Sequence, residues 1–139
     1  MQKNVSDGLP LPQRYGAIAT IVIGISMAVL DGAIANVALP TIAKDLNASP
    51  ASSIWIVNAY QIAIVISLLS LSFLGDMFGY RRVYQCGLVV FTLTSLFCAL
   101  SDSLHTLTLA RIAQGFGGAA LMSVNTALIR LIYPQRHLG

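Results

Sequence analysis

Two side chains of opposite charge, Asp31 and Arg111, each lie deep inside a long apolar segment. Asp31 is the single charged residue between Tyr15 and Leu39. A lone charge at the centre of a membrane-spanning helix costs about 2.5–3.5 kcal/mol on insertion scales. An ion pair would offset much of this cost, so we expect the two helices that carry these residues to be in contact or to face a shared cavity.

Asp31 and Arg111 could do one of two things. A static buried pair would only order the helix bundle. The alternative is proton coupling, because a carboxylate stays charged beside a guanidinium and binds a proton when it is left in apolar surroundings. Movement of Arg111 away from Asp31 would then cause Asp31 to bind a proton. The residues alone leave both interpretations open.

The composition of the chain indicates that these charges lie in a lipid bilayer. Of the 139 residues, 56% are hydrophobic and 9% are charged, whereas a soluble domain carries about 25% charged residues. Eight basic and five acidic residues give a formal net charge of +3, and the basic residues other than Arg111 are scattered at the ends of apolar segments and form no patch. We therefore expect lipid, and not nucleic acid, as the partner of this chain.

Four apolar segments are long enough to cross a membrane, at about 15–39, 53–75, 83–100 and 104–132. Backbone groups in lipid must be satisfied internally, so each segment is predicted to be an α-helix. The fold class is therefore an all-α, multi-pass membrane protein. Residues 1–14 are predicted to be a cytoplasmic tail, 15–133 a four-helix membrane segment, and 134–139 the start of a cytoplasmic loop.

The connections predict the orientation of the chain. The stretches 40–53, 75–82 and 101–103 are rich in turn-forming residues, so neighbouring spans should be antiparallel. Six basic residues fall on one side and one, Lys44, on the other, which predicts a cytoplasmic N-terminus. Trp55 and Tyr60 are interpreted as part of an interfacial aromatic belt. The six basic residues are Lys3, Arg14, Arg81, Arg82, Arg130 and Arg136.

Small and uncharged polar residues accompany both charges at helical spacing. Small residues let helix backbones approach closely, and the positions predicted to do so are Gly24, Ala28, Gly115 and Gly118. Polar side chains in the spans could line a water-filled cavity or form hydrogen bonds between helices, and these are Asn36, Asn58, Gln61, Gln114 and Asn125. The sequence contains no set of residues typical of a metal site, a cofactor site or an enzyme active site.

Three stretches together resemble the fourteen-span drug:proton antiporters of the major facilitator superfamily. They are "LDGAIANVALP" (30–40), "LGDMFGYRR" (74–82) and "LARIAQGFGGAA" (109–120). The first is similar to the motif of the first span, the second to the signature loop after the second span, and the third to the R-x-x-Q-G-x-G motif of the fourth span. The resemblance covers nearly the whole chain, in the same order and spacing.

The resemblance implies a role for particular residues. It implies that Asp31 and Arg111 take part in proton coupling. It also implies that the loop after the second span latches the two halves of a transporter, through Asp76, Gly79, Arg81 and Arg82. The loop departs from the family pattern, because Ser72 replaces its first Gly, and Met77 and Tyr80 replace two of its Arg residues. Arg81 and Arg82 could also act only as topology anchors.

The function implied by the resemblance is export of small amphipathic or cationic compounds by alternating access, coupled to protons. The location implied is the bacterial inner membrane. Such a transporter needs twelve or fourteen spans, so this chain would be its N-terminal part and would work with the remaining spans. Two alternatives are a complete four-span carrier that acts as a dimer, and a membrane scaffold without transport activity whose Asp–Arg pair is structural.

Overall fold

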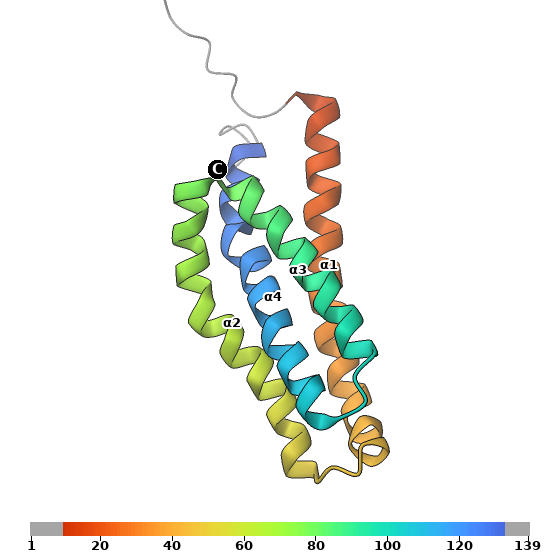
Figure 1. Cartoon of the computed structure of the whole chain (residues 1–139). Helices are drawn as coiled ribbons and strands as arrows, with labels where there is room; N and C mark the ends of the chain where they lie inside the picture. Colours follow the sequence, from red (N-terminus) through yellow and green to blue (C-terminus); the bar gives the residue numbers. More distant parts are fainter. Residues whose placement is uncertain (1–9, 133–139) are drawn as a thin grey trace, which may run out of the picture.

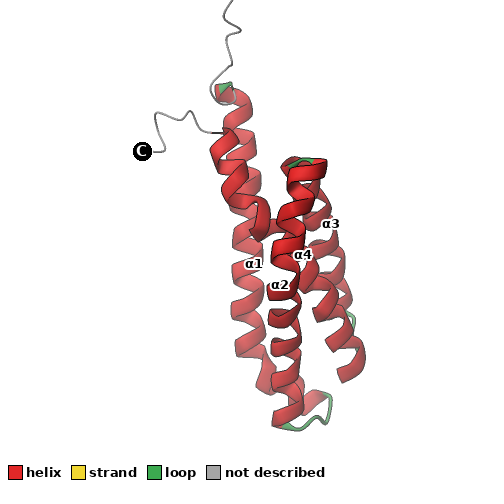
Figure 2. Cartoon of the chain, turned by 90° about the vertical axis from the view of Figure 1, so that its left-hand side faces the viewer, coloured by secondary structure: helices red, strands yellow, loops and turns green. Residues whose placement is uncertain are grey.

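The computed structural model describes residues 10–132 and consists of four long helices (Figure 1). Their bounds are α1 Leu11–Asp45, α2 Pro50–Phe78, α3 Tyr80–Ala99 and α4 Leu104–Ile132. The described part of the chain contains no strand, and loops occur only at the two ends of the bundle (Figure 2). Each helix is long and apolar enough to cross a membrane. The prediction of an all-α membrane protein with four spans is confirmed.

Most of the predicted tail, 1–14, and the whole predicted loop, 134–139, lie outside the described residues, as do Lys3 and Arg136. The start of α1 and the link between α2 and α3 lie at the same end of the bundle (Figure 1). Arg14, Arg81 and Arg82 are therefore at one end, and Lys44, in the last turn of α1, is at the other. The cytoplasmic position of the N-terminus stays a prediction.

Helix α4 is the centre of the bundle and contacts the other three helices. In the most apolar 18-residue stretch of α4, 44% of the residues are buried, whereas in the corresponding stretch of α1 only 17% are buried. The largest fully buried side chains are Phe91 of α3 and Gln114, Leu121 and Val124 of α4. Helix α1 lies at the side of the bundle, so most of its large apolar side chains are exposed and suited to lipid or to further helices.

Glycines bring α4 very close to its neighbours. A Cβ added at Gly115 would lie 2.7 Å from Ala63 Cβ and 2.8 Å from the Tyr60 carbonyl oxygen, both on α2. A Cβ at Gly118 would meet the Tyr60 hydroxyl at 3.2 Å. These two glycines thus face α2, whereas Arg111, on the same stripe, reaches α1 with its long side chain.

Small residues on α1 receive a side chain from α3. Gly24 is buried, and a Cβ there would lie 2.1 Å from the hydroxyl oxygen of Tyr84. That hydroxyl donates a hydrogen bond to the backbone carbonyl of Thr20 at 3.0 Å. Ala28, one turn further along α1, is also buried. The missing side chain at Gly24 therefore makes room for the tyrosine that ties α1 to α3.

The link between α1 and α2 is shorter than the sequence indicates. We expected 40–53 to be a connection, but α1 continues through Pro40 to Asp45 and α2 begins at Pro50. A proline inside a helix removes only its own N–H bond and bends the helix locally, so it need not end it. Ser49 then caps α2, because its side chain accepts a hydrogen bond from the Ser52 N–H at 3.1 Å.

The link between α2 and α3 is a single residue, Gly79. We expected a loop over 75–82, but α2 extends to Phe78 and α3 begins at Tyr80. Gly79 has a φ of +94°, and its N–H donates to the carbonyl of Gly75 at 3.0 Å. Only glycine adopts this backbone conformation without strain. A sharp reversal in one residue explains why the polar stretch around it remains helical.

Several hydroxyl groups of α3 are bonded within the chain. The side chains of Thr92, Thr94 and Ser95 each donate a hydrogen bond to the backbone carbonyl four residues earlier, and Ser101, just after the helix, does the same. Such bonds satisfy a hydroxyl hydrogen that lipid could not. They explain how α3, with a mean hydropathy of 1.4, is compatible with a membrane span.

Candidate functional site

Asp31 of α1 and Arg111 of α4 form an ion pair between their helices. The guanidinium Nη1 donates a hydrogen bond to Asp31 Oδ2 at 2.6 Å. The Asp31 side chain is 20% exposed and that of Arg111 is 11% exposed. The structure therefore brings together the two side chains that the sequence singled out, across the contact between α1 and α4.

Gln114 completes this ion pair. One turn after Arg111, its carboxamide nitrogen donates to Asp31 Oδ1 at 2.9 Å, and its carboxamide oxygen accepts from Arg111 Nη1 at 2.9 Å. Its side chain is fully buried. Of the two roles predicted for Gln114, the structure shows hydrogen bonding between helices, which occupies its whole carboxamide. Its spacing of three residues from Arg111 is the signal that places both on one helix face.

Helix α3 contributes two further groups that the sequence analysis did not select. The Gln114 nitrogen also donates to Ser95 Oγ at 2.8 Å, and the Cys98 thiol lies 3.6 Å from the Gln114 oxygen and donates to it. Ser95 and Cys98 are three residues apart and so lie on one face of α3. Nothing in the residue types distinguishes Ser95 from the other hydroxyl residues of α3, or Cys98 from Cys86.

Tyr60 of α2 lies beside the ion pair. The Arg111 guanidinium carbon is 5.9 Å from the centre of its ring, within the range of a cation–π contact. Tyr60 is 8% exposed, so its interpretation as an interfacial aromatic is wrong. It is buried because Gly118, opposite its hydroxyl, leaves room for it on α4. All four helices therefore contribute to the surroundings of the ion pair.

A small pocket of about 60 Å³ opens beside Arg111, between α1 and α2. Asn36 and Gln61, two of the predicted cavity residues, line it together with Tyr60. It has room for water, and Arg111 has a buried Nε without a hydrogen-bond partner among the described residues.

The other two predicted cavity residues lie elsewhere. Asn58 of α2 is exposed and does not line this pocket. Asn125 of α4 is half-buried, and its Oδ1 has no hydrogen-bond partner among the described residues. The structure thus does not gather the five polar residues into one cavity.

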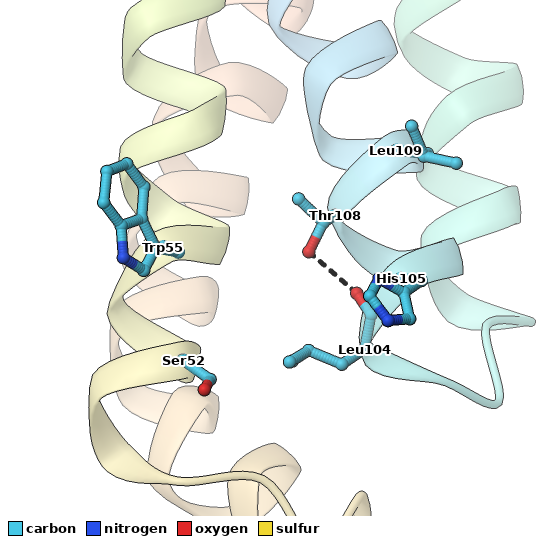
Figure 3. A pocket seen from close by; sticks show the side chains of 6 residues that line it. All are labelled: Ser52, Trp55, Leu104, His105, Thr108 and Leu109. Carbon is cyan, nitrogen blue, oxygen red and sulfur yellow. Dashed lines mark hydrogen bonds between the residues drawn. The ribbon is translucent and has the colours of Figure 1, made fainter.

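A second pocket, of about 350 Å³, lies between the first turns of α2 and α4 (Figure 3). Its lining is mixed, and the Thr108 hydroxyl in it is already bonded to the Leu104 carbonyl at 2.7 Å. The residues around it are Ser52, Trp55, Leu104, His105, Thr108 and Leu109. Thr108 precedes Arg111 by three residues, so this pocket lies about one helix turn closer to the membrane surface than the ion pair.

The predicted latch residues lie around Gly79, at the end of the bundle opposite to this second pocket. Asp76 accepts a hydrogen bond from the Tyr80 hydroxyl, one turn later in the chain. Arg81 and Arg82 are exposed, and Arg82 borders an apolar groove along α2, α3 and α4. Tyr80, which replaces an arginine of the family pattern, thus gives Asp76 a neutral partner in place of a charged one.

Asp31 is the acidic group of the central site, and it accepts two hydrogen bonds, one from a cation and one from an amide. A carboxyl group in a membrane span is a candidate site for binding and release of a proton. Among the described residues no group of three or more His, Cys, Asp or Glu side chains is placed to hold a metal ion.

Comparison with known proteins identifies the family. The chain is 86% identical over its whole length to "Uncharacterized transporter YebQ" of Escherichia coli (strain K12), and covers 30% of that protein. It is 34% identical over 93% of its length to "Riboflavin transporter RibZ" of Clostridioides difficile (strain 630), covering 28% of it. It is 39% identical over 83% of its length to "Putative multidrug resistance protein MdtD" of Salmonella paratyphi B, covering 24% of it.

The chain therefore spans less than a third of the length of these relatives. The family profile described as Major Facilitator Superfamily matches residues 21–139. This match includes the whole of the central site, the one-residue link at Gly79 and the glycine-rich face of α4. It assigns the chain to a family of membrane transporters and not of enzymes. The chain belongs to the major facilitator superfamily.

Proposed function

We propose that this chain forms the first four spans of a proton-coupled secondary transporter, which exports small amphipathic or cationic compounds by alternating access. Asp31 is the proton-binding group, and Arg111 is the residue that controls its charge. The single observation that carries this proposal is the buried ion pair between α1 and α4. Ionisable residues inside a membrane are rare and mark proton and substrate pathways.

Alternating access supplies the movement that this pair needs. In such transporters one helix bundle rocks against another around a site near the middle of the membrane. Helix α1 lies at the side of the present bundle and carries Asp31, so a shift of α1 relative to α4 would lengthen the bond to Arg111. Proton uptake by Asp31 and the conformational change would then be two aspects of one step.

We further propose that the stretch around Gly79 is a latch at the cytoplasmic surface, with the N-terminus of the chain on the same side. Asp76, Arg81 and Arg82 lie together at this end of the bundle, and the two arginines have exposed side chains. Exposed arginines can bind acidic groups of a second bundle, or anionic lipid headgroups. The Tyr80–Asp76 bond limits the charge that is available to such a latch.

The relatives support transport of small molecules and name two kinds of cargo. One is named for multidrug resistance and one for riboflavin. Riboflavin is a second candidate cargo, because the relative named for it aligns with 93% of this chain. Because the chain covers less than a third of each relative, a complete four-span carrier is the less favoured alternative.

The experiment is a transport assay with the protein expressed from its complete reading frame and reconstituted in lipid vesicles. A fluorescent organic cation and riboflavin serve as cargo, and the pH gradient across the membrane is varied. The variants are Asp31→Asn, which cannot be charged, and Arg111→Lys, which keeps the charge but cannot form the same fork of hydrogen bonds. Asp102→Asn, in the exposed link after α3, is the matched control.

We expect wild type and Asp102→Asn to move cargo faster when a pH gradient is applied, and Asp31→Asn to lose this response. If the transport rate of wild type does not depend on the pH gradient, proton coupling is overturned. A response that survives in Asp31→Asn would remove Asp31 from the mechanism. A bundle that folds and transports no cargo in any variant would favour the scaffold alternative.

A further inference from the structure

We propose that Ser95 and Cys98 of α3 are positioning residues that set the proton affinity of Asp31, although neither touches it. They act through Gln114, whose carboxamide they hold in one of its two orientations. The proposal rests on the proposed function, and assigns to α3 a part in proton coupling that the ion pair alone does not require.

The first step is the complete use of the Gln114 carboxamide. Its nitrogen has two hydrogens, which go to Asp31 and Ser95. Its oxygen has two lone pairs, which accept from Arg111 and Cys98. A carboxamide can make no more than these four bonds. Since the side chain is fully buried, no water competes for any of them.

The second step is that Ser95 acts as an acceptor. Its own hydroxyl hydrogen is donated to the backbone carbonyl of Phe91 at 2.8 Å. Its oxygen therefore has lone pairs to offer and no hydrogen, and it prefers the nitrogen end of the carboxamide. Helix α3 thereby draws the NH₂ group of Gln114 to the side on which Asp31 lies.

The third step is that Cys98, unlike Ser95, acts as a hydrogen-bond donor to Gln114. Its thiol hydrogen points to the carboxamide oxygen, with a sulfur–oxygen distance of 3.6 Å. A thiol is a weak donor, but it favours the same orientation as Ser95. Together the two side chains keep a donor in front of Asp31 and an acceptor in front of Arg111.

The consequence is an effect on the charge of Asp31. A donor aimed at a carboxylate stabilises its charged form. Were the carboxamide reversed, its oxygen would face Asp31 Oδ1, and the two oxygens could form a hydrogen bond only if the acid carried a proton. Ser95 and Cys98 therefore favour the unprotonated acid, and their removal should let Asp31 bind its proton at a higher pH.

Replacement of Ser95 changes no charged or titratable group around Asp31. The charged and titratable side chains that act on it are Arg111 from α4, Tyr60 from α2 and Cys98 itself from α3. Replacement of Ser95 leaves all three in place and removes no charge. A shift of the pH profile in that variant would thus report the orientation of Gln114.

The test measures transport by the reconstituted full-length protein as a function of pH, in the assay described above. We expect the pH of half-maximal transport to rise by about half a pH unit in Ser95→Ala, a threefold change in proton affinity, as suits the loss of one neutral hydrogen bond. Cys98→Ala should shift it in the same direction by a smaller amount. Ser95→Thr and Cys98→Ser, which keep the hydrogen-bonding groups, should restore the wild-type profile.

Two controls separate this role from a merely structural one. Cys86→Ala removes the other, exposed thiol of α3 and should leave the profile in place. Gln114→Met abolishes the link, so adding Ser95→Ala to it should produce no further shift. An unshifted profile in Ser95→Ala, or an equal shift with and without Gln114, would overturn the proposal while leaving proton coupling intact. If wild type itself has no pH dependence that Asp31→Asn removes, the proposed function fails first.

Discussion

Gly117 of α4 lies directly against the backbone of Phe91 on α3. A Cβ added at Gly117 would lie 2.7 Å from the Phe91 nitrogen and 2.9 Å from its Cα. Because the nearest atoms belong to the Phe91 backbone, rotation of a side chain could not relieve the clash. Ser95 and Cys98 are one and two turns further along α3, so this contact fixes the distance at which α3 meets Gln114.

We predict that Gly117→Ala destabilises the bundle by about 1–3 kcal/mol, because overpacking a close helix contact forces the helices apart. The measurement is reversible unfolding of the protein in mixed detergent micelles. Gly32→Ala is the matched control, since no atom lies within 4 Å of a Cβ at that position. It should be neutral or slightly stabilising, through the better helix propensity of alanine. Equal effects of the two substitutions would contradict the close contact.

A second prediction concerns the ion pair as a structural element. Arg111→Ala leaves Asp31 buried without its cation, and we expect a loss of stability of about 3 kcal/mol. The same substitution in the Asp31→Asn background should cost clearly less, because no charge is then left unpaired. A double-mutant cycle of unfolding free energies measures the difference. Additive effects would indicate that the two side chains do not interact in the membrane.

The attachment of α1 to α3 depends on Gly24 and Tyr84. We predict that Gly24→Ala expels the Tyr84 hydroxyl, whose oxygen would lie 2.1 Å from the new Cβ. Loss of its hydrogen bond to the Thr20 carbonyl should cost about 1 kcal/mol. In the Tyr84→Phe background the same alanine should cost less, since the hydroxyl is absent. Thermal unfolding of the four variants tests this, and Gly16→Ala, in open space, is the control.

The one-residue link at Gly79 leads to a fourth prediction. Gly79→Ala places a Cβ on a backbone with φ of +94°, which we expect to cost about 1–3 kcal/mol. Because the strain is at the end of α2 and α3, it should also disturb the orientation of the latch residues Asp76 and Arg81. Hydrogen exchange of the backbone around residue 79 should increase. Gly16→Ala again serves as a control, and unchanged exchange would argue against a strained link.

The sequence predicted the main features of the fold because bilayer physics leaves few choices. Four apolar segments of sufficient length must be helices, and short links make them antiparallel. The ion pair could be predicted from two isolated charges at similar depths. The ends of the helices could not, because Pro40 and the polar residues around Gly79 are tolerated inside helices near the membrane surface.

The partners of the ion pair were harder to predict than the pair itself. Gln114, Tyr60 and Ser95 lie on three different helices. Residues of these types also occur elsewhere in membrane spans, so their identity alone does not place them at the ion pair. Which faces meet is decided by the close approach of glycines, such as Gly115 against α2 and Gly117 against α3. Helical spacing shows that a residue lies on a stripe, but it does not show which neighbour that stripe contacts.

The intrahelical bonds of the α3 hydroxyls have a consequence for biogenesis. A segment that leaves the translocation channel enters the lipid more readily when its surface is apolar, and hydroxyl groups without a hydrogen-bond partner would disfavour this step. Because Thr92 and Thr94 donate their hydroxyl hydrogens to carbonyls of their own helix, α3 can enter the lipid without a hydrogen-bonding partner on a neighbouring helix. The NH₂ group of Gln114 instead donates to Asp31 of α1 and Ser95 of α3. Because α4 is the last of the four helices in the chain, both partners precede it into the membrane.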